Sequence, residues 1–416
     1  MPPEEKEVTE KMDIGMLFLL TGAAILTGLA GILINQRTQI PDSLFLIVFG
    51  LLIGPVLGLV SGEAVNEFLP IVSTAAMVVI LLDSGISFDI SKILGLLRTS
   101  LIFTLSVAVL TTILITLFLV YFFGWDIGAA ALLGLIASGT TTITAMALIK
   151  DLKVDTKVKR LILLETIIND LTLILGAFII IDIIRFSTLE ISSAVSSIFS
   201  DIGIGLVLGA VFAIVWRKLL PKADITRELN YASTLGICLI LYFVAEALGG
   251  NSIIAIFAFS LMLGNYRKFS TILGTSKKSE SKKFENIMDS IESSQINFTF
   301  FMKAFFFVLL GATFSTSLLS SISIYMILGI IVLILIARLV SISGLSYFDK
   351  DFAPYKFLVT VLIPRGYVAA VLAFIPVQYG IEIPMFTDIV VILVVLTSIV
   401  AMIGVFAYAS IYNKRK

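Results

Sequence analysis

The sequence predicts an all-α membrane protein of about 13 transmembrane helices, arranged as inverted repeats with two broken, crossing helices. Three observations predict this fold: the composition, a series of apolar runs of membrane-spanning length, and an interruption at matching positions of each half. Of the 416 residues, 58% are hydrophobic and only 14% are charged, and the mean hydropathy is +1.09. Because soluble domains carry about 25% charged residues, the composition indicates a polytopic membrane protein.

Apolar runs of about 20 residues follow one another along the chain. The longest connection, residues 266–296, is rich in lysine and serine and is interpreted as a solvated linker with room for one amphipathic helix; a regulatory or lipid-binding role is the alternative. No connection is long enough for a soluble domain, so residues 1–416 form a single transmembrane domain. Residues 1–13 are a polar tail that does not resemble a cleavable signal sequence, and residues 412–416 form a second tail. The runs lie near 14–35, 41–60, 68–88, 99–123, 128–149, 161–184, 199–219, 229–248, 251–265, 297–316, 322–344, 355–378 and 386–411.

The positive charges predict the orientation. With 13 spans the two termini lie on opposite sides, and 23 of the 29 lysines and arginines then fall on one set of connections and 3 on the other. Cytoplasmic loops carry the excess of Lys and Arg. We therefore expect a multi-pass protein of the cell membrane with its N-terminus outside and its C-terminus in the cytoplasm.

The two halves of the chain predict repeats of opposite orientation. Residues 14–184 form the first repeat, 199–219 a connector helix and 229–411 the second repeat, so the fifth span corresponds to the twelfth. The fifth span, 128–149, contains Gly139 followed by Thr140, Thr141 and Thr142, which weaken a helix.

The twelfth span, 355–378, contains Pro364, Arg365 and Gly366. The two interrupted spans are expected to cross. Their crossing would bring the three threonines, Arg365 and Asp170 to one site near the membrane midplane.

The sixth span contains LLETIINDLTLILG, in which Glu165, Asn169 and Asp170 lie among apolar residues. A carboxylate at the bilayer centre costs about 2.5–3.5 kcal/mol, so such residues are either paired or functional. At 100° per residue the two carboxylates point about 140° apart, so one can be paired while the other faces a water-filled path. The alternative is that both are structural ion pairs.

Three cationic residues lie within spans. Arg365 is too deep for its side chain to reach the membrane surface, and we expect it to form an intramembrane ion pair with Glu165. Lys303 and Arg338 are interpreted as anchors that extend toward the surface. Asp83 also lies toward a span interior.

The composition excludes several functional classes. Cys238 is the only cysteine and there is no histidine, so neither a disulfide framework nor a cysteine-based metal site is expected. Without a nucleophile elbow or a soluble domain the chain is not expected to be an enzyme, and no cofactor is expected. The formal net charge of zero suggests no nucleic-acid partner.

Several segments resemble the sodium/proton antiporters of the monovalent cation:proton antiporter superfamily. These are IPDSLFLIVFGLLIGP, AEALGGNSIIAIFAFSLMLGN, FMKAFFFVLLGATF, ARLVSI and PRG. ETIIND, with the pair Asn169–Asp170, is similar to the electroneutral branch of that superfamily, whose electrogenic members have two aspartates there. The resemblance covers nearly all of the chain. It implies a homodimer in membrane lipid, with a role in pH homeostasis.

The resemblance also implies the ion-binding residues. Asp170 would alternately bind a cation, Na⁺ in the first instance, and a proton. Asn169 would help to hold the site, and Thr166 would offer a hydroxyl ligand. Asp83 lies near a position where some members supply an acidic ligand, and the arginine of PRG pairs with the glutamate that matches Glu165.

One departure from the family concerns the broken fifth span. Members usually carry Thr-Asp-Pro where this chain has Thr140, Thr141 and Thr142. One charge and one helix breaker are absent, which affects the expected ion selectivity and affinity. The hydroxyls of Thr140 and Thr141, with freed backbone carbonyls, are candidates to complete the ligand shell of an alkali cation.

The sequence therefore predicts exchange of Na⁺ or Li⁺ for H⁺, one for one, by competition of cation and proton at Asp170. K⁺/H⁺ exchange is the nearest alternative, because ligand spacing cannot be read from one chain. A cation channel and an organic-anion symporter of similar architecture are the alternatives from other classes.

Overall fold

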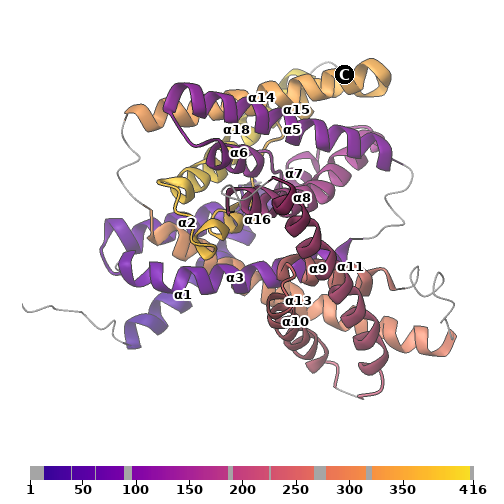
Figure 1. Ribbon diagram of the computed structural model, residues 1–416. Coiled ribbons are helices and arrows are strands. Elements are labelled where there is room, and N and C mark those ends of the chain that lie inside the picture. The colour runs from indigo at the N-terminus through magenta and orange to yellow at the C-terminus, as the bar shows by residue number, and fades with distance from the viewer. Residues whose placement is uncertain are drawn as a thin grey trace, which may run out of the picture. The chain divides into compact units, whose positions relative to one another are not determined.

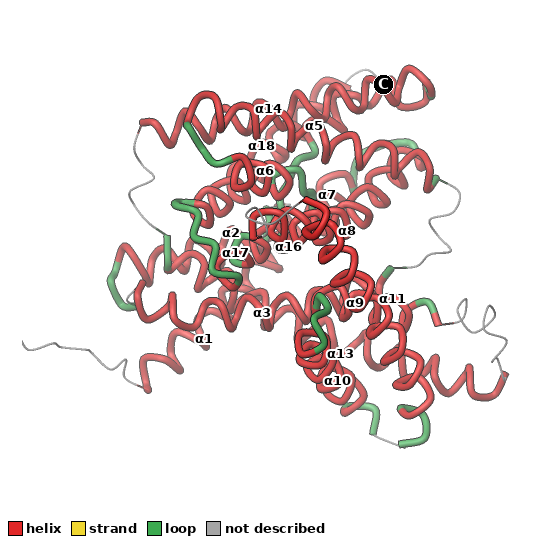
Figure 2. Tube along the Cα trace, in the orientation of Figure 1, coloured by secondary structure: helices red, strands yellow, loops and turns green. Residues whose placement is uncertain are grey.

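The computed structural model describes residues 14–38, 40–60, 62–88, 96–185, 191–223, 226–266, 278–314 and 321–412. Within these ranges the regular elements are all helices (Figure 2). The predicted tail 1–13 lies outside the described residues, as do residues 413–416 of the predicted tail 412–416 and residues 267–277 of the predicted linker.

In the described part of the chain, nine helices are long and apolar enough to cross a membrane (Figure 1). Shorter helices lie between them, and each of the predicted apolar runs falls on one or more helices; the number of spans stays a prediction. The long helices are α1 (Ile14–Thr38), α3 (Gly62–Ser87), α5 (Leu97–Phe123), α8 (Thr156–Arg185), α9 (Ile191–Leu219), α10 (Leu229–Ala247), α13 (Lys278–Ala312), α14 (Ser321–Phe348) and α18 (Phe386–Tyr412). The shorter ones are α2 (Asp42–Leu51), the π-helix η1 (Leu52–Val56), α6 (Ile127–Ile136), α7 (Thr142–Ile149), α11 (Ser252–Gly264), the 3₁₀-helix η3 (Lys350–Tyr355), α15 (Lys356–Val361), α16 (Tyr367–Leu372) and α17 (Ile375–Gln378).

Local sequence signals set several helix ends. Gly124 follows α5 with a φ of 68°, a left-handed conformation that glycine adopts without strain. Asp126 caps α6 by accepting a hydrogen bond from the backbone N–H of Ala129 at 3.0 Å. Asn251 caps α11 in the same way, from the N–H of Ile254 at 3.0 Å. The fifth and ninth spans therefore begin at defined residues.

The helix α13 extends further than the apolar run predicts. Residues 278–296, expected to be a linker, are helical and continue into the apolar half of α13. Phe284, Met288 and Ile291 are buried at helical spacing, whereas Asn286 and Asp289 between them are exposed. This segment is therefore an amphipathic helix, which a search for continuous apolar runs does not detect.

The described chain divides into two compact units. The first combines the described residues of Met1–Leu69 with Lys303–Phe314, the last turns of α13. Within it the Nζ of Lys303 lies 2.8 Å from Oδ2 of Asp42, so this lysine forms an ion pair instead of extending to the membrane surface as predicted. Gly50 lies against the backbone of Val308 and Gly311, which allows α2 and α13 to pack closely.

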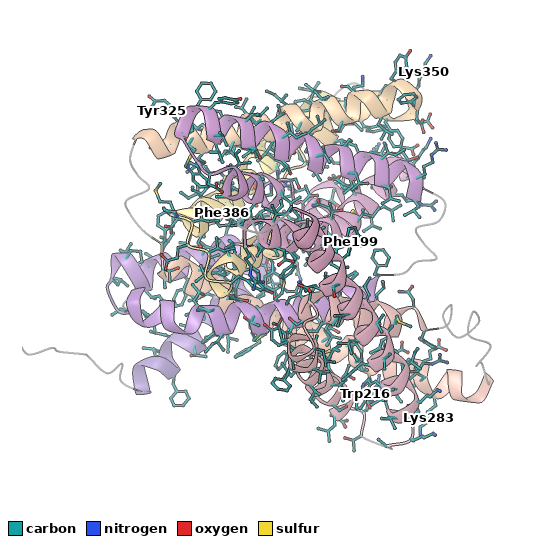
Figure 3. All side chains as sticks on the ribbon, viewed as in Figure 1. Phe199, Trp216, Lys283, Tyr325, Lys350 and Phe386 are labelled. Atoms are coloured by element: carbon teal, nitrogen blue, oxygen red, sulfur yellow. The ribbon has the colours of Figure 1, made fainter. Side chains whose placement is uncertain are left out.

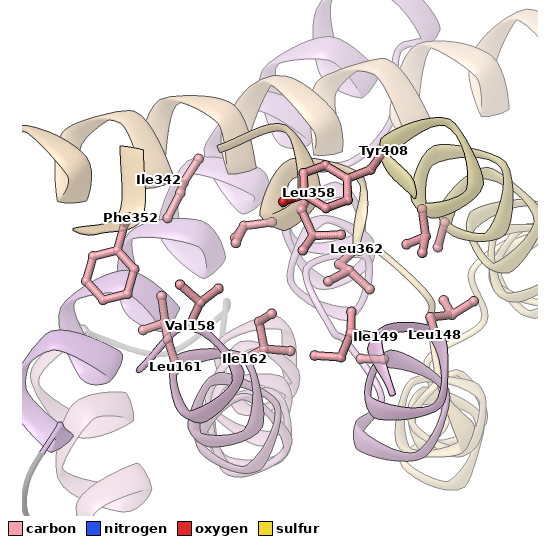
Figure 4. Packing of buried hydrophobic residues seen from close by; sticks show 14 of the residues in the cluster. Leu148, Ile149, Val158, Leu161, Ile162, Ile342, Phe352, Leu358, Leu362 and Tyr408 are labelled. Atoms are coloured by element: carbon pink, nitrogen blue, oxygen red, sulfur yellow. The ribbon is translucent and has the colours of Figure 1, made fainter. Parts of the chain in front are cut away.

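The second unit, Pro70–Met302 with Ser315–Lys416, contains every candidate site residue. One apolar cluster in it joins both broken spans to the long helices α8, α14 and α18 (Figure 4). Leu148 of α7, Leu161 of α8 and Leu358 of α15 are fully buried there, with Ile342 of α14 and Val405 of α18. This core fixes the two half-helices α7 and α15, between which the polar site is built.

The close contact in the first unit predicts that Gly50→Ala destabilises the protein. A Cβ at Gly50 would clash with the carbonyl oxygen of Val308, which is backbone and cannot turn aside. Overpacking of this kind costs about 1–3 kcal/mol. The matched control is Gly22→Ala in α1, where an added Cβ meets nothing within 4 Å. We expect the apparent melting temperature of the purified protein to fall only for Gly50→Ala; equal melting temperatures would contradict this packing.

Candidate functional site

Two helices are interrupted, and their interruptions contact each other. Residues 137–141 separate α6 from α7, and residues 362–366 separate α15 from α16. The backbone N–H of Thr141 donates to the carbonyl oxygen of Pro364 at 3.0 Å. A Cβ on Gly366 would lie 2.6 Å from Cβ of Thr141, so the glycine permits this approach. The prediction that the fifth and twelfth spans are broken and cross is confirmed.

Arg365 holds the broken fifth span. Its guanidinium is buried and donates to the backbone carbonyl of Ser138 at 3.3 Å and to that of Gly139. Its backbone N–H donates to Oγ1 of Thr397 in α18 at 3.2 Å. Carbonyls freed by a helix interruption need donors at membrane depth, and the arginine of one interruption supplies them to the other.

Glu165 pairs with Arg338, and not with Arg365 as predicted. Nη1 and Nη2 of Arg338 donate to the two carboxylate oxygens of Glu165, at 2.5 and 3.1 Å. Arg338 is fully buried and Glu165 is 2% exposed, so Arg338 does not extend to the membrane surface either. The predicted direct pair is wrong: the guanidinium of Arg365 donates to carbonyls of the fifth span and interacts with Glu165 only electrostatically, without a salt bridge. Arg338 also donates to the carbonyl of Val359 at 3.0 Å.

Threonines of the broken span contact the polar face of α8. Oγ1 of Thr140 donates to Glu165 at 3.1 Å, and Nδ2 of Asn169 lies 3.5 Å from the same hydroxyl. Oγ1 of Thr142 donates to Oγ1 of Thr166 at 2.8 Å. The sequence predicts Thr142 near the crossing but not as an ion ligand. The sequence feature that could have identified Thr142 as a site residue is its position in the same run of three threonines.

Asp170 has a different environment. It is partly buried in α8, and its carboxylate makes no hydrogen bond or ion pair with another described residue. Its charged neighbour is Asp83 of α3, close enough for the two carboxylates to interact electrostatically. Thus the structure brings Thr140, Asn169 and Glu165 into one hydrogen-bonded group and gives Asp170 no partner among the described residues.

A sequence model described as "Sodium/hydrogen exchanger, transmembrane" matches residues 22–410. The chain belongs to this family. It is therefore a multi-pass membrane protein of a transporter family, as its apolar helices also indicate.

Two known antiporters are similar to this chain in sequence. The low-affinity Na⁺/H⁺ antiporter NhaS1 of Synechocystis sp. is 27% identical over 230 residues, 54% of this chain and 41% of that protein. The match thus spans less than half of that relative. The Na⁺/H⁺ antiporter 1 of Methanocaldococcus jannaschii is 24% identical over 385 residues, covering 89% of this chain and 85% of the relative.

Solved structures share the fold. The sodium proton antiporter MjNhaP1 from Methanocaldococcus jannaschii at pH 8 aligns with a TM-score of 0.71 and 20% identity, over 95% of this chain and 97% of that one. An electron-microscopy structure of the same antiporter gives a TM-score of 0.69 at 20% identity, over 96% of each chain. The chain therefore shares the all-helical fold of these structures.

The geometry predicts which arginine is coupled to Glu165. Glu165→Gln or Arg338→Met alone leaves an uncompensated buried charge, so each should destabilise the protein by about 3–5 kcal/mol. The double variant should recover part of that loss, whereas Glu165→Gln combined with Arg365→Met should not. Unfolding of purified variants measures both cycles. Additive losses for Glu165 with Arg338, or strong coupling of Glu165 to Arg365 instead, would contradict the assignment.

Proposed function

We propose that the chain is a secondary active transporter that exchanges Na⁺ or Li⁺ for H⁺, one for one, by competition at Asp170. The observation that carries the proposal is the carboxylate of Asp170, which has no ion-pair partner among the described residues although it lies within a membrane-spanning helix. Membership of the sodium/hydrogen exchanger family and the names of two relatives support the choice of ions.

The physical basis is the cost of an unpaired charge. A lone carboxylate at membrane depth is costly, and it is neutralised either by a proton or by a bound cation. Glu165 has no such need, because Arg338 neutralises it. A proton and a cation exclude each other on one carboxylate, so release of either one on the opposite side requires uptake of the other. This competition is the coupling of the exchange.

Oxygen ligands suit an alkali cation as substrate. Besides the carboxylate of Asp170, we propose as ligands the hydroxyls of Thr166, Thr140 and Thr141 and the amide oxygen of Asn169. Asp83 is the second acidic group that a cation near Asp170 would meet. With Asn169 neutral, one charge enters for each charge that leaves.

The proposed exchange also implies how the chain is arranged in the membrane. The chain would form two inverted repeats, residues 14–184 and 229–411, and one helical bundle would rock against the other around the site, exposing it to each side in turn. We propose an N-terminus outside, a C-terminus in the cytoplasm, a homodimer in membrane lipid, and no enzymatic activity.

Asp170→Asn tests this function most simply. The variant cannot exchange a proton for a cation at residue 170, so we expect Na⁺-driven proton movement in proteoliposomes to disappear while the protein remains folded. The matched control is Asp182→Asn on the same helix, a carboxylate already near Arg185 at 3.6 Å, and it should retain exchange. Substantial proton movement with Asp170→Asn, at wild-type levels of folded protein, would refute the proposal.

A further inference from the structure

A polar cavity lies away from the crossed helices, where α10 begins beside the first half of α13. Its volume is about 510 Å³. It lies within the second unit, and its wall is held together by a hydrogen bond from Oγ of Ser290 to the carbonyl oxygen of Arg227 at 2.6 Å. The lining residues are Arg227, Asn230, Lys283, Asn286, Ile287 and Asp289.

The lining favours an anion. Arg227 and Lys283 carry positive charges, with Lys283 extending from α13 (Figure 3), while Asp289 is the single carboxylate among the described lining residues. The side chains of Asn230 and Asn286 add amide N–H donors. A cavity with a net positive charge and more donors than acceptors suits a ligand whose atoms are mainly acceptors, and guanidinium and ammonium groups together are typical of phosphate recognition.

The backbone at the start of α10 also favours binding of an anion. The helix α10 has 19 residues and its N-cap, Glu228, makes no side-chain capping hydrogen bond. N–H groups of a first helical turn, with the positive end of the helix dipole, attract anions. Arg227 and Asn230 lie on either side of this helix start and both line the cavity.

Asn230 is the observation that points to a ligand. It is 4% exposed, yet its side-chain amide makes no hydrogen bond with another described residue. Buried side-chain amides are satisfied in native proteins. Because Asn230 lines the cavity, a molecule inside it is in position to form a hydrogen bond with this amide.

From these observations we propose that the cavity binds a phosphate group, carried either by an anionic lipid or by a free phosphate. The helix α10 is about 28 Å long at 1.5 Å per residue, which matches the hydrocarbon thickness. Its first turn thus lies at a membrane surface, at the depth of lipid headgroups. The site takes a different ligand from the cation exchanged at Asp170, and its occupancy is measured without transport.

The experiment follows the melting of the purified full chain by tryptophan fluorescence. One arm titrates inorganic phosphate against chloride at equal ionic strength, and the other titrates dihexanoyl phosphatidic acid against dihexanoyl phosphatidylcholine. We expect a saturable rise in melting temperature with a phosphate-bearing probe. A response to inorganic phosphate assigns a free oxyanion, and a response to phosphatidic acid alone assigns a lipid headgroup.

Three variants make the assignment specific. Arg227→Gln should weaken the response about tenfold, the effect of one lost charge-assisted hydrogen bond. Lys222→Gln removes the same charge from an exposed residue that does not line the cavity, and it should behave as wild type. Asp289→Asn removes the one lining carboxylate, so it should bind the probe more tightly. The proposal is overturned if neither probe raises the melting temperature, if Arg227→Gln and Lys222→Gln respond alike, or if Asp289→Asn binds more weakly.

Discussion

The carboxylate of Glu165 receives two hydrogen bonds from Arg338 and a third from Thr140, and the polar centre of the molecule is built around it. Through these bonds and the bond from Arg338 to the carbonyl of Val359, one buried pair joins α8, α14, α15 and the broken fifth span. Irregular backbone at membrane depth persists only where protein groups satisfy it. The pair, with Arg365 on the carbonyls of Ser138 and Gly139, provides that satisfaction.

This pairing separates the two carboxylates of α8 by role. Glu165 is neutralised by the guanidinium of Arg338 and has a structural role. Asp170 lies five residues further along the same helix and is left without a counter-charge among the described residues, so it depends on a mobile one. Because Arg365 is committed to backbone carbonyls, it does not supply that charge. The absence of an aspartate in the Thr140–Thr142 segment leaves Asp170 and Asp83 as the acidic pair of the proposed site.

The sequence predicts the helices and both interruptions, because apolar length, glycine and proline act locally. It also predicts that the interruptions cross, because their places in the two halves correspond. It does not predict which arginine reaches Glu165: Arg338 and Arg365 both lie inside apolar runs, and the choice depends on how neighbouring helices are rotated and packed. The pairing of Lys303 with Asp42 is missed for the same reason. The helical start of α13 could have been found from the spacing of its buried apolar residues.

The most direct test of the account is the voltage dependence of exchange. If Asp170 alone carries either a proton or a cation, no net charge crosses the membrane, whereas each net charge would contribute about 2.3 kcal/mol per 100 mV. Proteoliposomes clamped with K⁺ and valinomycin, after K⁺ is shown not to be a substrate, are held at one pH difference and several voltages. The equilibrium Na⁺ ratio should follow the pH difference alone. A ratio that shifts with voltage would contradict one-for-one exchange and indicate a second proton carrier, for which Asp83 is the candidate.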